Sequence, residues 1–312
     1  MIIQENIPLA DKNWFKTGGA ARYFCQPKTE YDFQQALDFA QSHNLPLFVL
    51  GEGANIVVHD RGFDGLVINM LSDMPTYHSL TTETTAVTVS AGTTMHSLIE
   101  KTLDHNLIGL EVFSNIPGTI GGSVYINLHY FEAFLSDFLI QAKVIHKKTQ
   151  EIVTVSKEWF DFGYDQSKLM HHEYFLLSAT FKLKNGSSEE VAFARGRQFE
   201  ITRHRQSRYP KDHTCGSFFR NFKDEEVHLL WEGKKMRFVA YYLDKIGVKG
   251  CLNVGNVWVS SQHANMLINK GNGTTADIIA LARILQQKVF ESFGIIPQPE
   301  CIFVGFKEYP LL

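Results

Sequence analysis

The segment that most restricts the fold of this chain is a glycine-rich stretch at residues 109–127. It reads GLEVFSNIPGTIGGSVYIN and places Gly118, Gly121 and Gly122 shortly after Pro117. Glycine adopts positive φ angles and lets another group approach the backbone closely, so consecutive N–H groups can surround a pyrophosphate. Because several glycines in one place are costly to order, this composition indicates a loop that a bound ligand requires.

A second glycine loop lies at residues 50–58, LGEGANIVV, where a short strand enters a turn containing Gly51, Gly53 and Asn55. Taken alone, this loop is explained equally well as a tight turn. It lacks the G-x-G-x-x-G spacing, so a Rossmann dinucleotide site is not supported.

The sequence around these loops alternates predicted strands and helices. Apolar residues at helical spacing predict a helix over residues 31–44 with Thr29 as its N-cap, and another after the turn at Gly92. That second helix has an apolar face made of Met95, Leu98, Ile99 and Leu103. Apolar or alternating runs predict strands at 47–50, 56–58, 86–90 and 178–184. Residues 185–190 are polar and predict a loop, and an arginine-rich stretch follows at 195–208. This alternation indicates an α+β or α/β fold.

The last third of the chain contains two further predicted helices. The first ends at Gly247 and carries Met236, Val239, Ala240 and Leu243. The second begins near Thr274, has Asp277 three residues later as in a capping box, and ends at Gly294.

Length and composition restrict the class of protein. A chain of 312 residues exceeds what one core usually organises, so two or three domains are expected. The net charge of −3 argues against nucleic acid as a partner, since phosphate neutralisation needs a basic excess. The opening stretch MIIQENIPLADKNWF predicts no signal peptide, and no apolar run predicts a membrane span. The four cysteines lie far apart, so we expect neither a zinc site nor a disulfide framework, which fits a reduced cytoplasm.

Eight segments in a fixed order resemble the UDP-N-acetylenolpyruvoylglucosamine reductase family, and the length resembles that of its shorter subtype. The segments are KTGGAARYF (16–24), LGEGAN (50–55), SAGTTMHSLIE (90–100), GLEVFSNIPGTIGG (109–122), TCGSFFRNF (214–222), IGVKG (246–250), VSSQHANMLIN (259–269) and IIPQPECIFVGF (295–306). They extend over nearly the whole chain, which makes the resemblance far more specific than any single motif.

The resemblance implies an α+β fold of three domains. Two α/β subdomains, 1–70 and 71–204, would form an FAD-binding domain of the PCMH type. Residues 205–303 would form a C-terminal α+β substrate-binding domain, and the tail 304–312 would return to the first subdomain.

The resemblance also implies an activity. NADPH would reduce a noncovalent FAD, which would then reduce UDP-N-acetylenolpyruvoylglucosamine to UDP-N-acetylmuramate for peptidoglycan synthesis, in a cytoplasmic monomer. The implied cofactor-binding residues are Leu50, Gly51, Gly53, Ala54, Asn55, Ile116, Pro117, Gly118, Gly121, Gly122, Ser123 and Asn127.

Two catalytic residues carry over directly from the family pattern. Ser217 corresponds to the serine that protonates the carbanion formed at the substrate α-carbon, and nearby cations must stabilise its alkoxide. Glu300 corresponds to the glutamate that stabilises the intermediate, and Pro297 and Pro299 restrain the backbone around it. The plainer alternatives are a small turn residue for Ser217 and a solvated loop carboxylate for Glu300.

The third catalytic position departs from the family pattern. The family tract is Tyr-Arg-x-Ser, whereas this chain reads YDQS over residues 164–167, so Asp165 replaces the arginine. An aspartate repels an anionic intermediate. Either Lys168, Arg208 or Arg220 supplies the missing positive charge, or the chemistry has been lost. The implied substrate-binding residues are Tyr164, Arg205, Arg208, Arg220, Asn221, His263 and Asn265.

A second departure follows Asn127, where the family commonly has Ala-Gly-Ala-Tyr-Gly and this chain has LHYFE at residues 128–132. We therefore keep two alternatives: a paralogue that binds FAD without turnover, and another FAD oxidoreductase on the PCMH-type scaffold. His171 and His172 lack a third ligand at metal spacing, so no metal is predicted.

Overall fold

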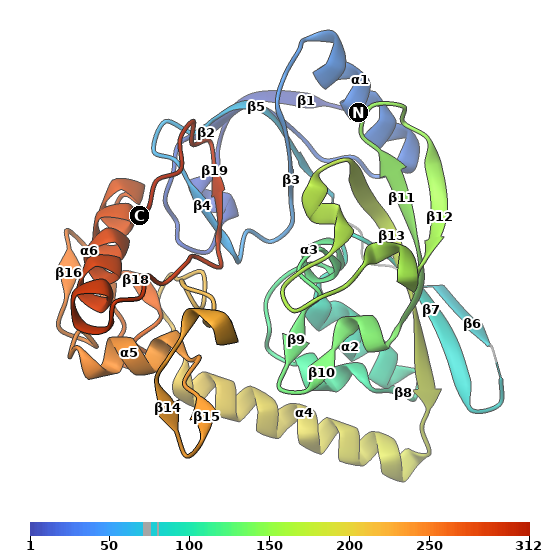
Figure 1. Ribbon diagram of the computed structural model, residues 1–312. Helices are drawn as coiled ribbons and strands as arrows, with labels where there is room; N and C mark the ends of the chain where they lie inside the picture. The colour runs from blue at the N-terminus through green and yellow to red at the C-terminus, as the bar shows by residue number, and fades with distance from the viewer. Residues whose placement is uncertain (71–75, 80) are drawn as a thin grey trace. The chain divides into compact units, whose positions relative to one another are not determined.

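The computed structural model describes residues 1–70, 76–79 and 81–312 (Figure 1). These residues form two compact units. Unit 1 consists of Met1–Ile3, Phe24–Glu52 and Leu66–Arg205, and unit 2 of Gln4–Tyr23, Gly53–Gly65 and Gln206–Leu312. The strands β2 (Ala20–Cys25) and β5 (Phe63–Asn69) contribute residues to both units. The three-domain division stays a prediction, and residue 71, where its second domain begins, lies outside the described residues.

Unit 1 is built on a six-stranded sheet whose recorded strand pairs are antiparallel. Its main path is β12 (Ile152–Ser156), β11 (Leu139–His146), β13 (Tyr174–Asn185), β7 (Thr84–Ser90) and β6 (Thr76–Ser79), and β8 (Leu107–Ile108) also pairs with β13. The predicted strands at 86–90 and 178–184 are confirmed within β7 and β13. Both are longer than predicted because pairing with a neighbour extends them: β7 takes in Thr84 and Thr85 against β13, and β13 takes in Tyr174–Leu176 against β11.

Helices α2 (Met95–Asp104) and α3 (Ile120–Tyr125) pack with this sheet (Figure 1). The apolar face predicted for α2 is confirmed, since Met95, Leu98, Ile99 and Leu103 are all buried. The Thr94 hydroxyl caps α2 by accepting from the Ser97 N–H.

The first helix, α1 (Glu30–Ser42), has the predicted N-cap. The Thr29 hydroxyl accepts from the Asp32 N–H at 3.0 Å, and the Asp32 carboxylate accepts from the Thr29 N–H at 3.1 Å. The next strand, β3 (Leu47–Leu50), has its predicted bounds and pairs in parallel with Leu66–Asn69 of β5.

The prediction of a loop at 185–190 is wrong for residues 188–190, because α4 (Ser188–Arg208) begins there. The Ser187 hydroxyl accepts from the Glu190 N–H at 3.2 Å, and the Glu190 carboxylate accepts from the Ser187 N–H at 2.9 Å. This is a capping box, so the polar residues start the helix rather than form a loop. Two arginines of α4 pair with carboxylates: Arg195 with Asp104, and Arg197 with the buried Glu111.

Unit 2 contains a three-stranded antiparallel sheet of β16 (Asn253–Val254), β17 (Val257–Val259) and β18 (Leu267–Asn269), with helices α5 (Val239–Lys245) and α6 (Thr275–Phe293). The prediction for α6 is confirmed by its Thr274–Asp277 capping box and by Gly294, which ends it at φ 72°. Strand β4 (Ile56–Val58), which also has its predicted bounds, pairs in parallel with β19 (Ile302–Val304).

The start predicted for α5 is wrong, because Met236 lies outside the helix. Its N–H donates to the carbonyl of Leu229 at 2.9 Å. This bond extends the hairpin of β14 (Leu230–Trp231) and β15 (Lys234–Lys235), so the backbone of Met236 is already paired when the helix begins at Val239. The predicted end near Gly247 is confirmed, since α5 stops at Lys245 and Gly247 has φ 70°.

The remaining short elements complete the chain. They are the strands β1 (Ile3–Pro8), β9 (His129–Tyr130) and β10 (Ala133–Phe134), and the 3-10 helices Ala10–Lys12, Leu110–Phe113, Leu135–Asp137, Lys157–Phe160, Lys168–His171 and Asp224–Glu226. None of the helices in the described part of the chain combines the length and the apolar character needed to cross a bilayer.

Candidate functional site

The two glycine loops meet within unit 1. A Cβ atom added to Gly51 would lie 2.5 Å from the Thr119 hydroxyl oxygen, so only glycine allows this approach. The Glu52 carboxylate accepts from the Gly118 N–H at 2.6 Å and ties the loops together. The side-chain amide of Asn69 donates to the carbonyls of Leu50 and Gly51 at 2.8 and 3.0 Å. The first loop is therefore more than an isolated tight turn.

The glycines of the second loop divide into two kinds. A Cβ at Gly118 would have no heavy atom of the described residues within 4 Å, and one at Gly122 would meet only the Thr119 hydroxyl at 3.9 Å. A Cβ at Gly121 would lie 3.1 Å from the carbonyl of Ala91, so packing within the protein explains that glycine. Gly118 and Gly122 thus leave open space next to the backbone, which fits a ligand that approaches closely.

The N–H groups of this loop are already engaged. Those of Gly118, Gly121 and Gly122 donate to Glu52, to Ala91 and to the Thr119 hydroxyl, respectively. A bound ligand would therefore pack against the α-carbons of Gly118 and Gly122 rather than take hydrogen bonds from these N–H groups.

The other residues predicted to hold the cofactor have distinct environments. In unit 2, Asn55 Oδ1 is buried and accepts no hydrogen bond from any residue that the structure describes. A buried acceptor of this kind is costly unless a ligand donor satisfies it. Gly53 has φ +67°, and its Cβ would lie 2.3 Å from the carbonyl of Lys12, so it is required by packing. Of the rest, Leu50 and Ser123 are buried and Ala54, Ile116 and Pro117 are half-buried.

Asn127 follows α3 with φ 50° and is buried. Its Nδ2 donates to the carbonyl of Gly163 at 2.9 Å, and its Oδ1 accepts from the Ser136 N–H at 3.2 Å. The amide thus links the end of α3 to the turn that precedes Tyr164 and Asp165.

In unit 2, backbone pairing brings Ser217 and Glu300 onto adjacent segments. The Glu300 N–H donates to the carbonyl of Phe218 at 2.9 Å, and the Arg220 N–H donates to the carbonyl of Gln298 at 2.9 Å. The two segments, 218–220 and 298–300, therefore run side by side in antiparallel directions. Two residues predicted from widely separated motifs are neighbours in the fold.

Asn265 holds the Ser217 segment in place. Its Oδ1 accepts from the Phe219 N–H at 3.1 Å, and its Nδ2 donates to the carbonyl of Phe219 at 2.7 Å. Its own carbonyl accepts from the Phe218 N–H at 2.8 Å. Asn265 is buried, and these bonds give it a structural role in addition to the predicted substrate-binding role.

Two of the three arginines predicted to bind substrate, Arg205 and Arg220, have protein partners. Arg220 forms a two-bond ion pair with Glu226 at 2.8 and 2.7 Å, and it donates to the carbonyl of Asn221 at 2.9 Å. The hydrogen bond from Arg220 lowers the pKa of Glu226 to about 2. In unit 1, Arg205 donates to the carbonyl of Asn115 at 3.1 Å and lies over the ring of Tyr130.

His263 lies next to Tyr209, with ring centroids 5.9 Å apart. Burial lowers the pKa of its imidazole, and the positive charge of Arg208 lowers it further. His263 Nδ1 accepts from the Asn265 N–H at 3.3 Å, which suits a neutral ring.

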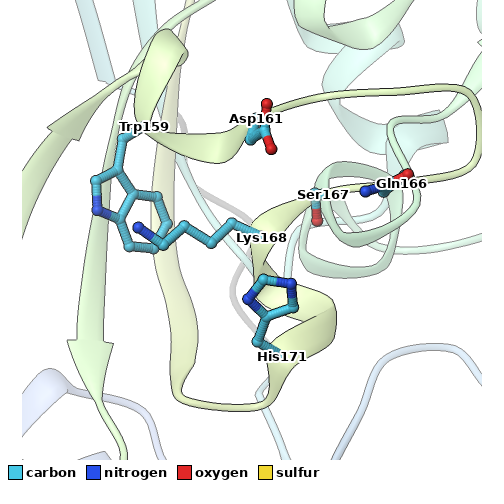
Figure 2. Close-up of a pocket in the computed structure, with 6 residues that line it drawn as sticks. All are labelled: Trp159, Asp161, Gln166, Ser167, Lys168 and His171. Atoms are coloured by element: carbon cyan, nitrogen blue, oxygen red, sulfur yellow. The ribbon is translucent and has the colours of Figure 1, made fainter.

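Asp165 has a histidine beside it that the sequence did not reveal as its partner. His129 Nδ1 lies 3.3 Å from Asp165 Oδ1, and the His129 ring lies 4.3 Å from that of Tyr164 between centroids. Lys168, which the sequence offered as the replacement cation, instead lies over the ring of Trp159 at 4.5 Å (Figure 2). It lines a cavity of about 200 Å³ together with Trp159, Asp161, Gln166, Ser167 and His171. The clue to His129 was its place in the departing segment 128–132.

Comparisons with known proteins agree along the chain. Residues 21–156 match the FAD binding domain family, and residues 208–304 match the C-terminal domain family of UDP-N-acetylenolpyruvoylglucosamine reductase. UDP-N-acetylenolpyruvoylglucosamine reductase 2 of Bacillus anthracis is 29% identical over 304 residues, which cover 97% of this chain and 93% of that protein. A reductase of Clostridium botulinum (strain Hall) is 29% identical over 299 residues, covering 96% and 91%.

Among solved structures, the chain is similar to the crystal structure of UDP-N-acetylenolpyruvylglucosamine reductase from Thermus caldophilus. The TM-score is 0.76 at 26% identity, and the match covers 97% of this chain and 100% of that one. The α+β fold with an FAD-binding domain is therefore confirmed.

Proposed function

This chain belongs to the UDP-N-acetylenolpyruvoylglucosamine reductase family, and we propose that it reduces UDP-N-acetylenolpyruvoylglucosamine to UDP-N-acetylmuramate. NADPH is the proposed electron donor and peptidoglycan precursor synthesis the proposed role. The cytoplasmic location and the monomeric state expected from the resemblance remain part of this proposal.

The features of unit 1 fit FAD as the cofactor. Gly118 and Gly122 leave open space beside the backbone. These residues would hold FAD, which when bound would supply the hydride for the reduction. The remaining steps depend on side chains of this chain.

The observation that carries the proposal is the pairing that brings the segments of Ser217 and Glu300 together. Reduction of the enolpyruvyl double bond adds a hydride to the β-carbon and a proton to the α-carbon. Ser217 is the proposed donor of that proton, through its hydroxyl group. Glu300 is the proposed stabiliser of the intermediate, held one segment away by the bond between its N–H and Phe218.

The experiment separates the two half-reactions. Purified protein is reduced by NADPH under anaerobic conditions while flavin absorbance is recorded, and the enolpyruvyl substrate is then added. Ser217→Ala should be reduced at nearly the wild-type rate, but its reoxidation by substrate should slow by about 10²-fold or more, since a positioned acid is lost. Ser217→Cys keeps a proton donor and should recover part of this loss.

A matched control is Ser292→Ala, because Ser292 is an exposed serine near the end of α6 in the same unit. It should match the wild type in both half-reactions. Equal losses in both half-reactions of Ser217→Ala would indicate a structural role for the serine. Wild-type protein that accepts electrons from NADPH and never passes them to the substrate would support the alternative raised by Asp165, a paralogue without turnover.

A further inference from the structure

The two places where this chain departs from the family pattern are in contact. His129 is the first residue of β9, within the segment 128–132, and Asp165 occupies the position of the expected arginine. Their side chains approach to 3.3 Å between Nδ1 and Oδ1, and each is 23% exposed. Two separate changes in the sequence thus form one partly buried pair.

The backbone around this pair is fixed on both sides. Asp165 has φ 52° in a turn that the Gly163 N–H closes by donating to the carbonyl of Gln166 at 3.1 Å. The same turn is bound to the end of α3 by the bond from Asn127 to the carbonyl of Gly163. Since a six-residue helix is about 9 Å long, α3 places the pair a short distance from the open glycines at its other end.

Contacts with aromatic rings hold the imidazole of His129 in position. Its centroid lies 4.3 Å from that of Tyr164 and 5.6 Å from that of Phe134 in β10. Tyr164, a predicted substrate-binding residue, adjoins Asp165 in sequence. A single imidazole therefore contacts the side chains of both Tyr164 and Asp165. A change at His129 therefore alters the contact with Asp165 and the support of Tyr164 together.

We propose that His129 is a positioning residue for the substrate half-reaction, which pairs with the Asp165 carboxylate and holds Tyr164. This inference rests on the proposed function. Negative charge grows on the substrate during hydride transfer, and an uncompensated carboxylate nearby would oppose it. His129 places its imidazole Nδ1 3.3 Å from the carboxylate, while Lys168 of the same stretch lies over Trp159.

The test is a double-mutant cycle on the rate of flavin reoxidation by the enolpyruvyl substrate. His129→Gln removes the imidazole that faces Asp165 and keeps a side chain that forms hydrogen bonds. In the wild-type background it should slow reoxidation by about tenfold, within the range of coupling for residues in contact. In the Asp165→Asn background, where no carboxylate needs compensation, the same change should slow it by less than about threefold.

Flavin content and the rate of reduction by NADPH show whether each variant is folded and loaded with cofactor. His43→Gln is the matched control, because His43 is an exposed histidine at the end of α1 in the same unit. It should leave both half-reactions at the wild-type rate.

Three results bear on the inference. Equal slowing by His129→Gln in the wild-type and Asp165→Asn backgrounds would overturn it, since the effect would then be unrelated to the carboxylate. Active wild-type protein with an unaffected His129→Gln variant would overturn it and leave the proposed function intact. Wild-type protein that fails to reduce the substrate would overturn the proposed function and this inference with it.

Discussion

Replacement of Gly122 by alanine should act on the free protein and on FAD binding in opposite directions. Gly122 lies in the first turn of α3, and the nearest heavy atom to its added Cβ is the Thr119 hydroxyl at 3.9 Å. Alanine therefore fits without strain. Because alanine favours helix over glycine, the free protein should gain about 0.5–1 kcal/mol, which raises Tm by roughly 1–3 °C at this size.

FAD binding should weaken in the same variant. If the cofactor packs against the α-carbon of Gly122, the new methyl group takes up space that the bound cofactor needs. Overpacking of this kind costs about 1–3 kcal/mol, which corresponds to a roughly 5- to 150-fold higher Kd. Gly122→Val, with a larger side chain, should weaken binding further.

The matched control is Gly196→Ala in α4. A Cβ at Gly196 also has no heavy atom of the described chain within 4 Å, so the helix should be stabilised to a similar extent. None of the predicted cofactor-binding residues lies in α4, so FAD affinity should not change.

The measurements are thermal unfolding of the apoprotein and fluorescence titration with FAD. The apoprotein is needed because bound FAD would itself raise Tm. Wild-type FAD affinity in Gly122→Ala would refute the placement of the cofactor. A decrease of more than about 1 kcal/mol in the free energy of unfolding of the apoprotein would refute the inference that alanine fits in open space at this position.

Two further predictions concern stability and thiol reactivity. Glu226→Gln should destabilise the protein by about 1–2 kcal/mol at pH 7, because the folded-state pKa of Glu226 is about 2 against an ordinary value of 4.5 and the carboxylate is 31% exposed. A lowered carboxyl pKa stabilises the fold above the ordinary pKa, so urea unfolding should show this difference shrinking as pH falls from about 4.5 to about 2; a constant difference would contradict the assignment. At pH 8 a thiol reagent should modify Cys251 rapidly and the other three cysteines only on unfolding, because Cys251 is exposed and they are buried. Burial raises the pKa of Cys25 to about 12 and also raises that of Cys215, so fast labelling of a second cysteine in folded protein, seen by mass spectrometry, would contradict this prediction.

Features that depend on a few neighbouring residues were predicted from the sequence. The N-caps at Thr29 and Thr274 and the strands 47–50 and 56–58 are examples. Each is set by side-chain chemistry and apolar spacing within the segment itself. The start of α4 belonged to the same class and was missed, although Ser187 and Glu190 have the spacing of a capping box.

Features that depend on distant residues were not predictable from local patterns. Met236 has helical spacing with its successors, yet its backbone is paired with Leu229 across a hairpin. The pairing of His129 with Asp165 joins residues 36 positions apart, and the bond from Asn127 to Gly163 spans the same separation. The glycine loops were identified from composition, but their hydrogen bonds to Glu52 and Ala91 required the structure.

The composition of unit 2 has a consequence for how the protein is made. Its residues come from distant parts of the chain, and the side chain of Asn269 donates to the carbonyl of Phe15, 254 positions away. Strand β4 likewise pairs with β19. During synthesis the ribosome releases β4 long before β19, so the edge of β4 that β19 will cover must wait until β19 has emerged. Contacts of such long range slow folding and leave apolar surface exposed meanwhile. Unit 2 therefore completes its fold only after β19 has been released, whereas most of unit 1 can fold while translation continues.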